Sequence, residues 1–216
     1  MNHPATSSSL PRQPSEPSAR PLRLDLDDLQ LRLAVATADD CAKGMFFNGA
    51  LNALATLGGP SVAEQCRQAS GLRKCVDFFN YPISHFLHLS FTAAQLLERP
   101  MGGYGAVFHR LGAQAVTDFL SSSVGKTLLL LAGKDARRLL TILPGAFRTA
   151  VTYGERSAEF SGPTQCQFTM KRDFMPHPYH EGVLKTVLEA MGVANVRVAG
   201  RRTGPLDATY QISWDS

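Results

Sequence analysis

Cysteine, tryptophan and long apolar runs are all scarce in this sequence of 216 residues. The four cysteines are Cys41, Cys66, Cys75 and Cys166, and no two are spaced as Cys-x-x-Cys. This argues against a zinc knuckle or a disulfide framework and favours reduced thiols. The longest apolar run, Thr127–Ala132, is far shorter than the roughly 20 residues that cross a bilayer, and the first residues lack the apolar region of a secretion signal. We therefore expect a soluble, cytoplasmic chain without a membrane span.

Charge of one sign is not concentrated anywhere either. The formal net charge is +4, and the densest basic stretches are the pairs Arg137-Arg138 and Arg201-Arg202. With no dense basic run, we expect no nucleic-acid partner. The hydrophobic share of 44% is usual for a soluble globular protein. The length suits one domain, so we predict a disordered Pro/Ser-rich tail at 1–21 and a single α+β domain at 22–216.

The clearest strand signal lies in the last third of the chain. Cys166, Phe168 and Met170 alternate with polar residues, which is the period of a half-buried strand. A Gly-Pro pair directly before this stretch is a turn signal. The pattern therefore predicts a hairpin of Arg156–Ser161 and Thr164–Arg172.

A helix and a second hairpin are expected to follow. Tyr179–Met191 carries an apolar stripe at helical spacing, and Gly192 stands where a left-handed C-cap belongs. Asn195–Arg201 and Ala208–Trp214 flank a Thr-Gly-Pro turn and predict two further strands. The C-terminal third therefore reads as strand, strand, helix, strand, strand.

The residues before this sheet predict mainly helices. The alternating leucines of Leu22–Val35 favour a strand or an extended arm instead. Capping signals, proline and glycine mark the expected helices. They cover 37–57, 60–69, 82–98, 104–120 and 134–143, and Pro144-Gly145 stops the last one. The segment after 120 is expected to be helical to 133, and the sequence leaves open whether Ser121-Ser122-Ser123 interrupts the helix. The predicted fold is α+β, with a helical N-terminal two thirds packed on a C-terminal four-stranded antiparallel sheet.

Two motifs invite functional interpretations that their spacing does not support. Gly125-Lys126-Thr127 lacks the glycine that a phosphate-binding loop needs five residues earlier, because position 120 is Leu. His177 and His180, with Glu181 and Cys166, suggest a metal site, but the two histidines do not have a helical ligand spacing. We favour a strand-to-helix connection in which His180 helps to cap the helix, and we expect no metal and no cofactor.

Catalysis has no support in the sequence. No Ser, Cys or Asp lies at a recognisable spacing from His85, His88 or His109, so a nucleophile–base pair is not indicated. The many phenylalanines of the helical part are explained most simply as core residues, and an aromatic-lined ligand pocket is the alternative. We expect the protein not to be an enzyme.

Several short motifs resemble a paralogous family of uncharacterised myxobacterial proteins, and the resemblance covers about Val35 to Trp214. The motifs are Lys43-Gly-Met-Phe-Phe47, Val76-Asp-Phe-Phe-Asn-Tyr-Pro82, Phe119-Leu-Ser-Ser-Ser-Val-Gly-Lys-Thr127, Tyr153-Gly-Glu-Arg156, Tyr179-His-Glu-Gly-Val-Leu184 and Gly200-Arg-Arg-Thr-Gly204. The family is a domain of unknown function, so the resemblance implies a fold and no activity.

The order of elements also resembles, more distantly, the superfamily of haem-nitric-oxide-binding domains, vinyl-4-reductase-type domains and TRAPP subunits. Leu111-Gly112 and Phe119-Leu120 follow the order of the haem branch, but Thr127 stands where that branch has its proximal His. Its Tyr-x-Ser-x-Arg signature corresponds to Phe168-Thr-Met-Lys-Arg172, which keeps only the Arg. The resemblance therefore implies a ligand-binding scaffold without haem.

Our leading hypothesis is a regulatory or sensory module that binds a small apolar ligand between helices and sheet. The expected ligand-binding residues are Phe46, Phe86, His109, Phe168 and Arg172, with Arg172 as the polar anchor. An interior apolar cavity of roughly 300 Å³ or more in this region would favour ligand binding.

The alternative hypothesis is a protein–protein interaction module, such as a homodimer, with a filled core. Gly49, Ala50 and Ala53 are small residues on one face of a predicted helix, and such a face suits a tight helix–helix interface. A packed core in place of a cavity would favour this interpretation.

Overall fold

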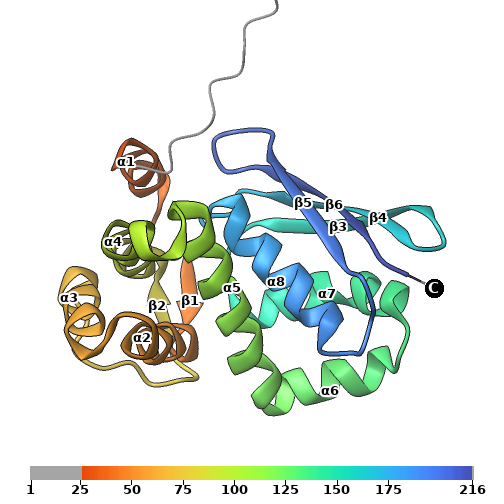
Figure 1. Cartoon of the computed structure of the whole chain (residues 1–216), viewed down its shortest axis with the longest axis horizontal. Coiled ribbons are helices and arrows are strands. Elements are labelled where there is room, and N and C mark those ends of the chain that lie inside the picture. The colour runs from red at the N-terminus through yellow and green to blue at the C-terminus, as the bar shows by residue number, and fades with distance from the viewer. Residues whose placement is uncertain (1–25, 216) are drawn as a thin grey trace, which may run out of the picture.

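The fold is seen in a computed structural model that describes residues 26–215 (Figure 1). The disordered tail predicted for 1–21 lies outside the described residues. The extent of the single domain predicted for 22–216 stays a prediction.

The predicted sheet is present, and the α+β fold class is confirmed. Its strands are β3 (Glu155–Gly162), β4 (Gln165–Lys171), β5 (Arg197–Arg202) and β6 (Ala208–Ser213), with α8 (His177–Glu189) inserted between β4 and β5. The spatial order is β3-β4-β6-β5, and every neighbouring pair is antiparallel. Cys166, Phe168 and Met170 are buried as their alternation predicts, and Phe168 lies opposite Tyr210 on β6. Helices α7 and α8 cover this apolar face (Figure 1).

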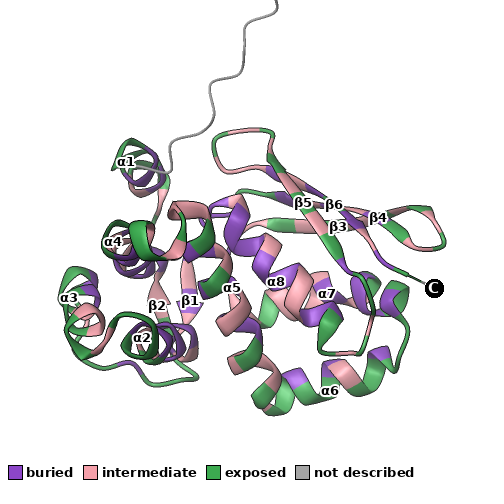
Figure 2. Cartoon of the chain, in the orientation of Figure 1, coloured by how far each residue is buried: buried purple, intermediate pink, exposed green. Residues whose placement is uncertain are grey.

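Helices dominate the chain before the sheet. They are α1 (Leu26–Val35), α2 (Gly44–Gly58), α3 (Pro60–Ser70), α4 (Ile83–Met101), α5 (Tyr104–Ser121), α6 (Ser123–Ala132) and α7 (Ala136–Ala150), with a small antiparallel pair of β1 (Cys41–Lys43) and β2 (Asn80–Pro82). Figure 2 shows α8 largely buried among its neighbours, whereas α6 is mostly exposed.

Two glycines allow α5 and α8 to cross at close range. A Cβ added to Gly112 on α5 would lie 1.8 Å from the Tyr179 carbonyl oxygen, and one added to Gly182 on α8 would lie 2.0 Å from the His109 carbonyl oxygen. Because no side chain larger than hydrogen fits at either position, the two backbones pack directly together. This contact fixes α8 between the helical layer and the sheet.

Three predictions for the part of the chain before the sheet were wrong. Leu22–Val35 was expected to be a strand or arm, but its described part is helix α1, which is stabilised by a buried ion pair of 2.8 Å between Asp28 and Arg32, one helical turn apart. The helix expected from Thr37 begins only at Gly44, since Cys41–Lys43 pairs with β2.

The third error concerns Pro144, which was expected to end a helix at Leu143. Helix α7 continues to Ala150 with Pro144 inside it. Leu143 is buried and Phe147 packs against the core beyond the proline. Tertiary burial on both sides of Pro144 therefore outweighs the local cost of the missing hydrogen bond.

The serine run Ser121–Ser123 does interrupt the helical segment. The Ser122 hydroxyl accepts a hydrogen bond of 3.1 Å from the Gly125 backbone N–H and starts α6. Helices α5 and α6 consequently meet at a bend of 90°. Within residues 26–215, no one helix has the length and apolar composition to cross a membrane, and α5 with α6 meets both criteria only when the two are joined across this bend.

Candidate functional site

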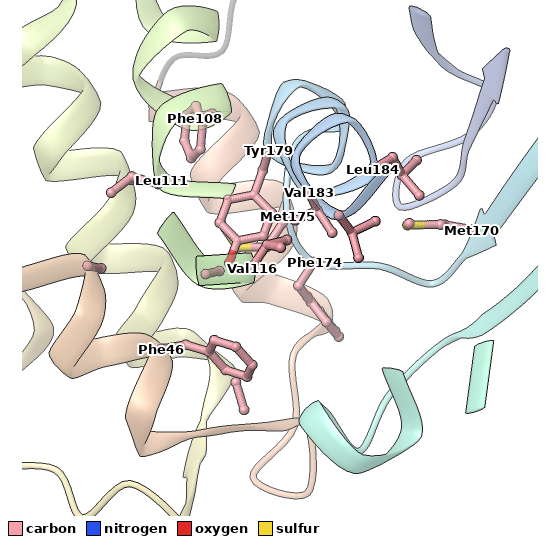
Figure 3. Packing of buried hydrophobic residues seen from close by; sticks show 14 of the residues in the cluster. Phe46, Phe108, Leu111, Val116, Met170, Phe174, Met175, Tyr179, Val183 and Leu184 are labelled. Carbon is pink, nitrogen blue, oxygen red and sulfur yellow. The ribbon is translucent and has the colours of Figure 1, made fainter. Parts of the chain in front are cut away.

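A cavity of about 80 Å³ lies where α2, α4, α5, α7 and α8 converge above the sheet. Most of its lining is apolar and comes from Ala42, Phe46, Ile83, Phe86, Ala115, Val116, Phe119, Leu128, Leu143, Ala146, Phe147, Ala150, Val151, Met175, Val183 and Val187. Figure 3 shows the Tyr179 ring reaching from α8 toward Val116 and Met175, with Phe46 of α2 on the far side. The cavity is smaller than the roughly 300 Å³ usual for drug-sized ligands.

The polar part of the lining is a buried ion-pair cluster. Asp173, in the link between β4 and α8, forms an ion pair with Arg156 of β3. It also accepts hydrogen bonds from His180 Nε2, at 2.7 Å, and from the Met175 backbone N–H, at 3.0 Å. The side chains of Arg156, Asp173 and His180 are each at most 5% exposed. We call these three residues the Asp173 cluster.

The carboxyl group of Asp173 is ionised although it is buried. Burial alone would raise the pKa of Asp173, but the facing His180 and Arg156 outweigh burial and hold this pKa well below its usual value. Burial, reinforced by the nearby negative Asp173, raises the pKa of the lining tyrosines Tyr153 and Tyr179 far above the usual range. At neutral pH the site therefore has a carboxylate anion and uncharged phenols.

Two polar atoms of the cluster are left without a partner. His180 Nδ1 and Arg156 Nε are buried and have no hydrogen-bond partner among residues 26–215. Unsatisfied buried polar groups are uncommon in native structures and cost free energy. Both belong to side chains that line the cavity.

The predicted ligand-binding residues are only partly brought together. Phe46 and Phe86 line the cavity. Phe168 is fully buried on β4 and packs against the ring of Phe147, 6.3 Å away between centroids, and His109 on α5 is half-buried. Neither Phe168 nor His109 belongs to the cavity lining.

Arg172, the predicted polar anchor, is engaged elsewhere. Its guanidinium forms hydrogen bonds of 2.6 and 2.8 Å with the two carboxylate oxygens of Asp40, and this contact lowers the pKa of Asp40. Its backbone has a positive φ of 50°, and its side chain is 48% exposed. It therefore joins the β4 end to the turn before β1.

The Asp173 cluster was not predicted from the sequence. His180 was expected to help cap a helix, but no side chain of residues 26–215 caps the N-terminus of α8, and His180 binds Asp173. One signal was available: His180 lies on the same helical face as Val183, Leu184 and Val187, and a polar residue on an apolar face needs a partner. The partner residues could not be found, because folding brings Arg156 and Asp173 together from different elements.

The remaining histidine and cysteine side chains form no alternative centre. Within the described part of the chain, no three His, Cys, Asp or Glu side chains are grouped as a metal ion would require. The four cysteines form no disulfide there. Burial raises the pKa of the Cys66 and Cys166 thiols to about 11, so both are protonated at neutral pH.

Comparison with protein families identifies the chain. The family described as "Protein of unknown function (DUF2378)" matches residues 35–215. The chain belongs to this family. The resemblance to a domain of unknown function is thereby confirmed, and the family contributes no activity. No curated protein matches the sequence.

Solved structures with the same fold include several H-NOX proteins. The A71G mutant of the H-NOX protein from K. algicida, in an unliganded Fe(II) form, matches with a TM-score of 0.65 at 14% identity and covers 81% of this chain and 97% of its own. The H-NOX protein from S. oneidensis in the Fe(II)NO state matches with a TM-score of 0.65 at 15% identity, covering 81% and 99%. The distant likeness to haem-nitric-oxide-binding domains is confirmed, and at such identities it shows the fold alone.

The residues of this DUF2378 chain do not fit haem. The cavity of about 80 Å³ is too small for a macrocycle, since even drug-sized ligands occupy roughly 300 Å³ or more. Thr127, at the expected position of the proximal His, is exposed on α6 and donates its hydroxyl hydrogen to the Ser123 carbonyl at 2.9 Å. Arg172, the one retained residue of the propionate signature, is paired with Asp40. Any ligand of this cavity has to be much smaller.

Proposed function

We propose that this DUF2378 protein is a non-enzymatic regulatory or sensory module that binds a small apolar ligand in the cavity beside α8. The observation that carries the proposal is a cavity with an apolar lining and a buried cluster that has unpaired polar atoms. Ligand sites commonly combine apolar walls with a few polar groups that orient the ligand. The haem-binding H-NOX proteins with this fold support a sensory role by analogy.

The cavity size limits the ligand to a few heavy atoms. An engineered apolar cavity of roughly 150 Å³ binds benzene or xenon. The present cavity, at about 80 Å³, is about half as large. Because α6 and α7 contribute part of the lining and α6 meets α5 at a bend, ligand binding is expected to stabilise the packing of α6 and α7 against the rest of the domain.

The proposal can be tested with a variant that fills the cavity. Ala146→Leu puts an isobutyl group on α7 where the cavity is lined by a methyl group. Small apolar compounds, such as xenon and short-chain alcohols and alkanes, should raise the melting temperature of the wild-type protein and leave that of Ala146→Leu unchanged. Native mass spectrometry of the purified wild type should find a small bound molecule or a free site that such compounds fill.

The matched control is Ala55→Leu, which makes the same substitution at an exposed position on α2. It should respond to the compounds as the wild type does. If no compound shifts the melting temperature of the wild type and no ligand co-purifies, ligand binding is contradicted. Equal shifts in wild type and Ala146→Leu would place binding outside the cavity.

A second candidate function, a protein–protein interaction module, is favoured by exposed aromatic residues. Phe78 and Phe79, in the loop before β2, are 75% and 64% exposed. Large exposed apolar side chains next to each other are typical of interaction surfaces. Sedimentation velocity at micromolar concentration tests this function: a dimer that Phe78→Ser with Phe79→Ser converts to a monomer would support it.

The small-residue face of α2 is not available for such a dimer. Ala50 and Ala53 are buried in the chain, and a Cβ on Gly49 would lie 1.6 Å from Oδ2 of Asp118 on α5. The face does form a tight helix–helix contact, but with α5 of the same chain. A homodimer has to use another surface.

A further inference from the structure

We propose that the Asp173 cluster anchors the hydroxyl group of a small, uncharged, otherwise apolar molecule. The inference rests on the proposed ligand-binding function and names the chemical class of the ligand. It starts from the two unpaired atoms of the cluster, Arg156 Nε and His180 Nδ1. Every other polar side-chain atom of the cluster makes at least one hydrogen bond within the chain.

The other polar atoms of the Asp173 cluster are bound within the chain. Asp173 uses one carboxylate oxygen for Arg156 and the other for His180 Nε2 and the Met175 N–H. The second terminal nitrogen of Arg156 donates to the Tyr153 carbonyl oxygen. The guanidinium lies over the rings of Phe147 and Tyr153, 5.0 and 5.5 Å from their centroids. What remains are two nitrogens without any hydrogen bond, Nε of Arg156 and Nδ1 of His180.

The hydrogen-bonding character of the two remaining atoms decides which ligand group fits them. When His180 Nε2 donates to the Asp173 carboxylate, Nδ1 accepts a hydrogen bond in the uncharged imidazole and donates one in the charged imidazole. Arg156 Nε can only donate. A hydroxyl group donates one hydrogen bond and accepts others, so its chemistry matches both atoms in either charge state of His180. A methyl group in its place would satisfy neither.

Charge selects an uncharged ligand over an acid. Arg156 already faces the anionic Asp173, so the pair is neutral as it stands. A carboxylate in the cavity would add a buried charge that is compensated only where His180 is charged, and burying an uncompensated charge is costly. An alcohol needs neither a proton nor a new counterion. The apolar walls, with Val116, Val183 and Phe46 among them, suit its hydrocarbon part.

The anchoring role is tested with two probes of the same shape. Dissociation constants of 1-butanol and n-pentane, which differ by a hydroxyl in place of a methyl group, are measured by NMR titration of the wild type and of His180→Phe. For each protein, the dissociation constant of n-pentane is divided by that of 1-butanol. Comparing this ratio between the two proteins cancels the different hydration of the probes. We expect this ratio to fall by roughly tenfold or more in His180→Phe, since the hydroxyl loses its hydrogen bond with Nδ1.

His88→Phe is the control, because it makes the same replacement on α4 outside the cavity lining. The ratio should be unchanged there. If His180→Phe does not fold, ¹⁵N spectra of the wild-type imidazole replace it: 1-butanol should shift the His180 Nδ1 resonance, and n-pentane should leave it in place. Unequal responses to the two probes would therefore support the inference without any variant.

Three outcomes would overturn it. If both probes bind and the ratio is the same in wild type and His180→Phe, or the Nδ1 resonance responds equally to both, the cavity binds apolar molecules and the cluster does not anchor them. If butyrate binds the wild type more tightly than 1-butanol, the ligand class is acidic. If none of the probes binds, the proposed function fails together with the inference.

Discussion

Asp173 is the residue on which the polar end of the cavity depends. It contacts β3 through Arg156 and α8 through His180, and its own link connects β4 to that helix. A carboxylate in this position stabilises the fold only while it is ionised and paired. Removing one partner of a buried pair leaves the other charge uncompensated.

We predict that Asp173→Asn lowers the free energy of unfolding by about 3–5 kcal/mol, the usual cost of breaking a buried ion pair. Urea unfolding followed by circular dichroism measures the change. Asp39→Asn, at an exposed position, is the control and should stay within about 0.5 kcal/mol of the wild type. A loss below 1 kcal/mol at Asp173 would contradict the assigned ion pairs.

The low pKa of Asp173 also predicts a pH dependence. Its pKa in the folded state lies below the ordinary value of 3.8, so its contribution to stability is fully present above about pH 4 to 5. That contribution is lost as the pH falls from there toward the folded-state pKa. The free energy of unfolding should therefore decline less steeply below pH 4 in Asp173→Asn than in the wild type. Parallel declines in the two proteins would contradict the prediction.

At the scale of elements, the crossing of α5 and α8 holds the cavity in shape. Gly182→Ala forces a methyl group into the backbone of α5, where the His109 carbonyl oxygen leaves no room. We predict a loss of about 1–3 kcal/mol or more, since overpacking a rigid contact displaces the backbone. Thermal unfolding measures the loss.

Gly145→Ala is the matched control on α7. An added Cβ there would meet only the end of the Arg148 side chain, at 3.7 Å. Alanine favours a helix over glycine by roughly 0.5–1 kcal/mol, so this variant should be neutral or slightly more stable. Equal behaviour of Gly182→Ala and Gly145→Ala would show that the helices do not cross as closely as described.

Most elements could be predicted from local sequence pattern, and the errors have physical causes. The sheet and α8 were found because apolar alternation and glycine signals mark them directly. Helix α1 was missed because the alternating leucines concealed the Asp28–Arg32 pair, and Pro144 looked like a helix end because burial beyond it is a tertiary effect. The site was only half predictable: Phe46 and Phe86 belong to apolar helix faces, whereas Arg156, Asp173 and His180 form a site only after three elements meet.

For the whole molecule, the central claim is that the space beside α8 is a binding cavity. The fold shared with H-NOX proteins is retained in this DUF2378 chain, while the residues present exclude a haem held as in the haem branch. In place of a haem site, the chain has a small cavity and one buried polar cluster. A cavity of this size suits a molecule of a few heavy atoms.

The most direct test is an NMR titration of ¹³C-labelled methyl groups with 1-butanol. Val116 and Val183 line the cavity, whereas Leu130 on α6 is 82% exposed and serves as an internal control. If the cavity binds 1-butanol, the Val116 and Val183 methyl resonances should show saturable shifts while those of Leu130 stay in place. Non-saturating shifts of all three residues, or no shift at Val116 and Val183, would contradict it.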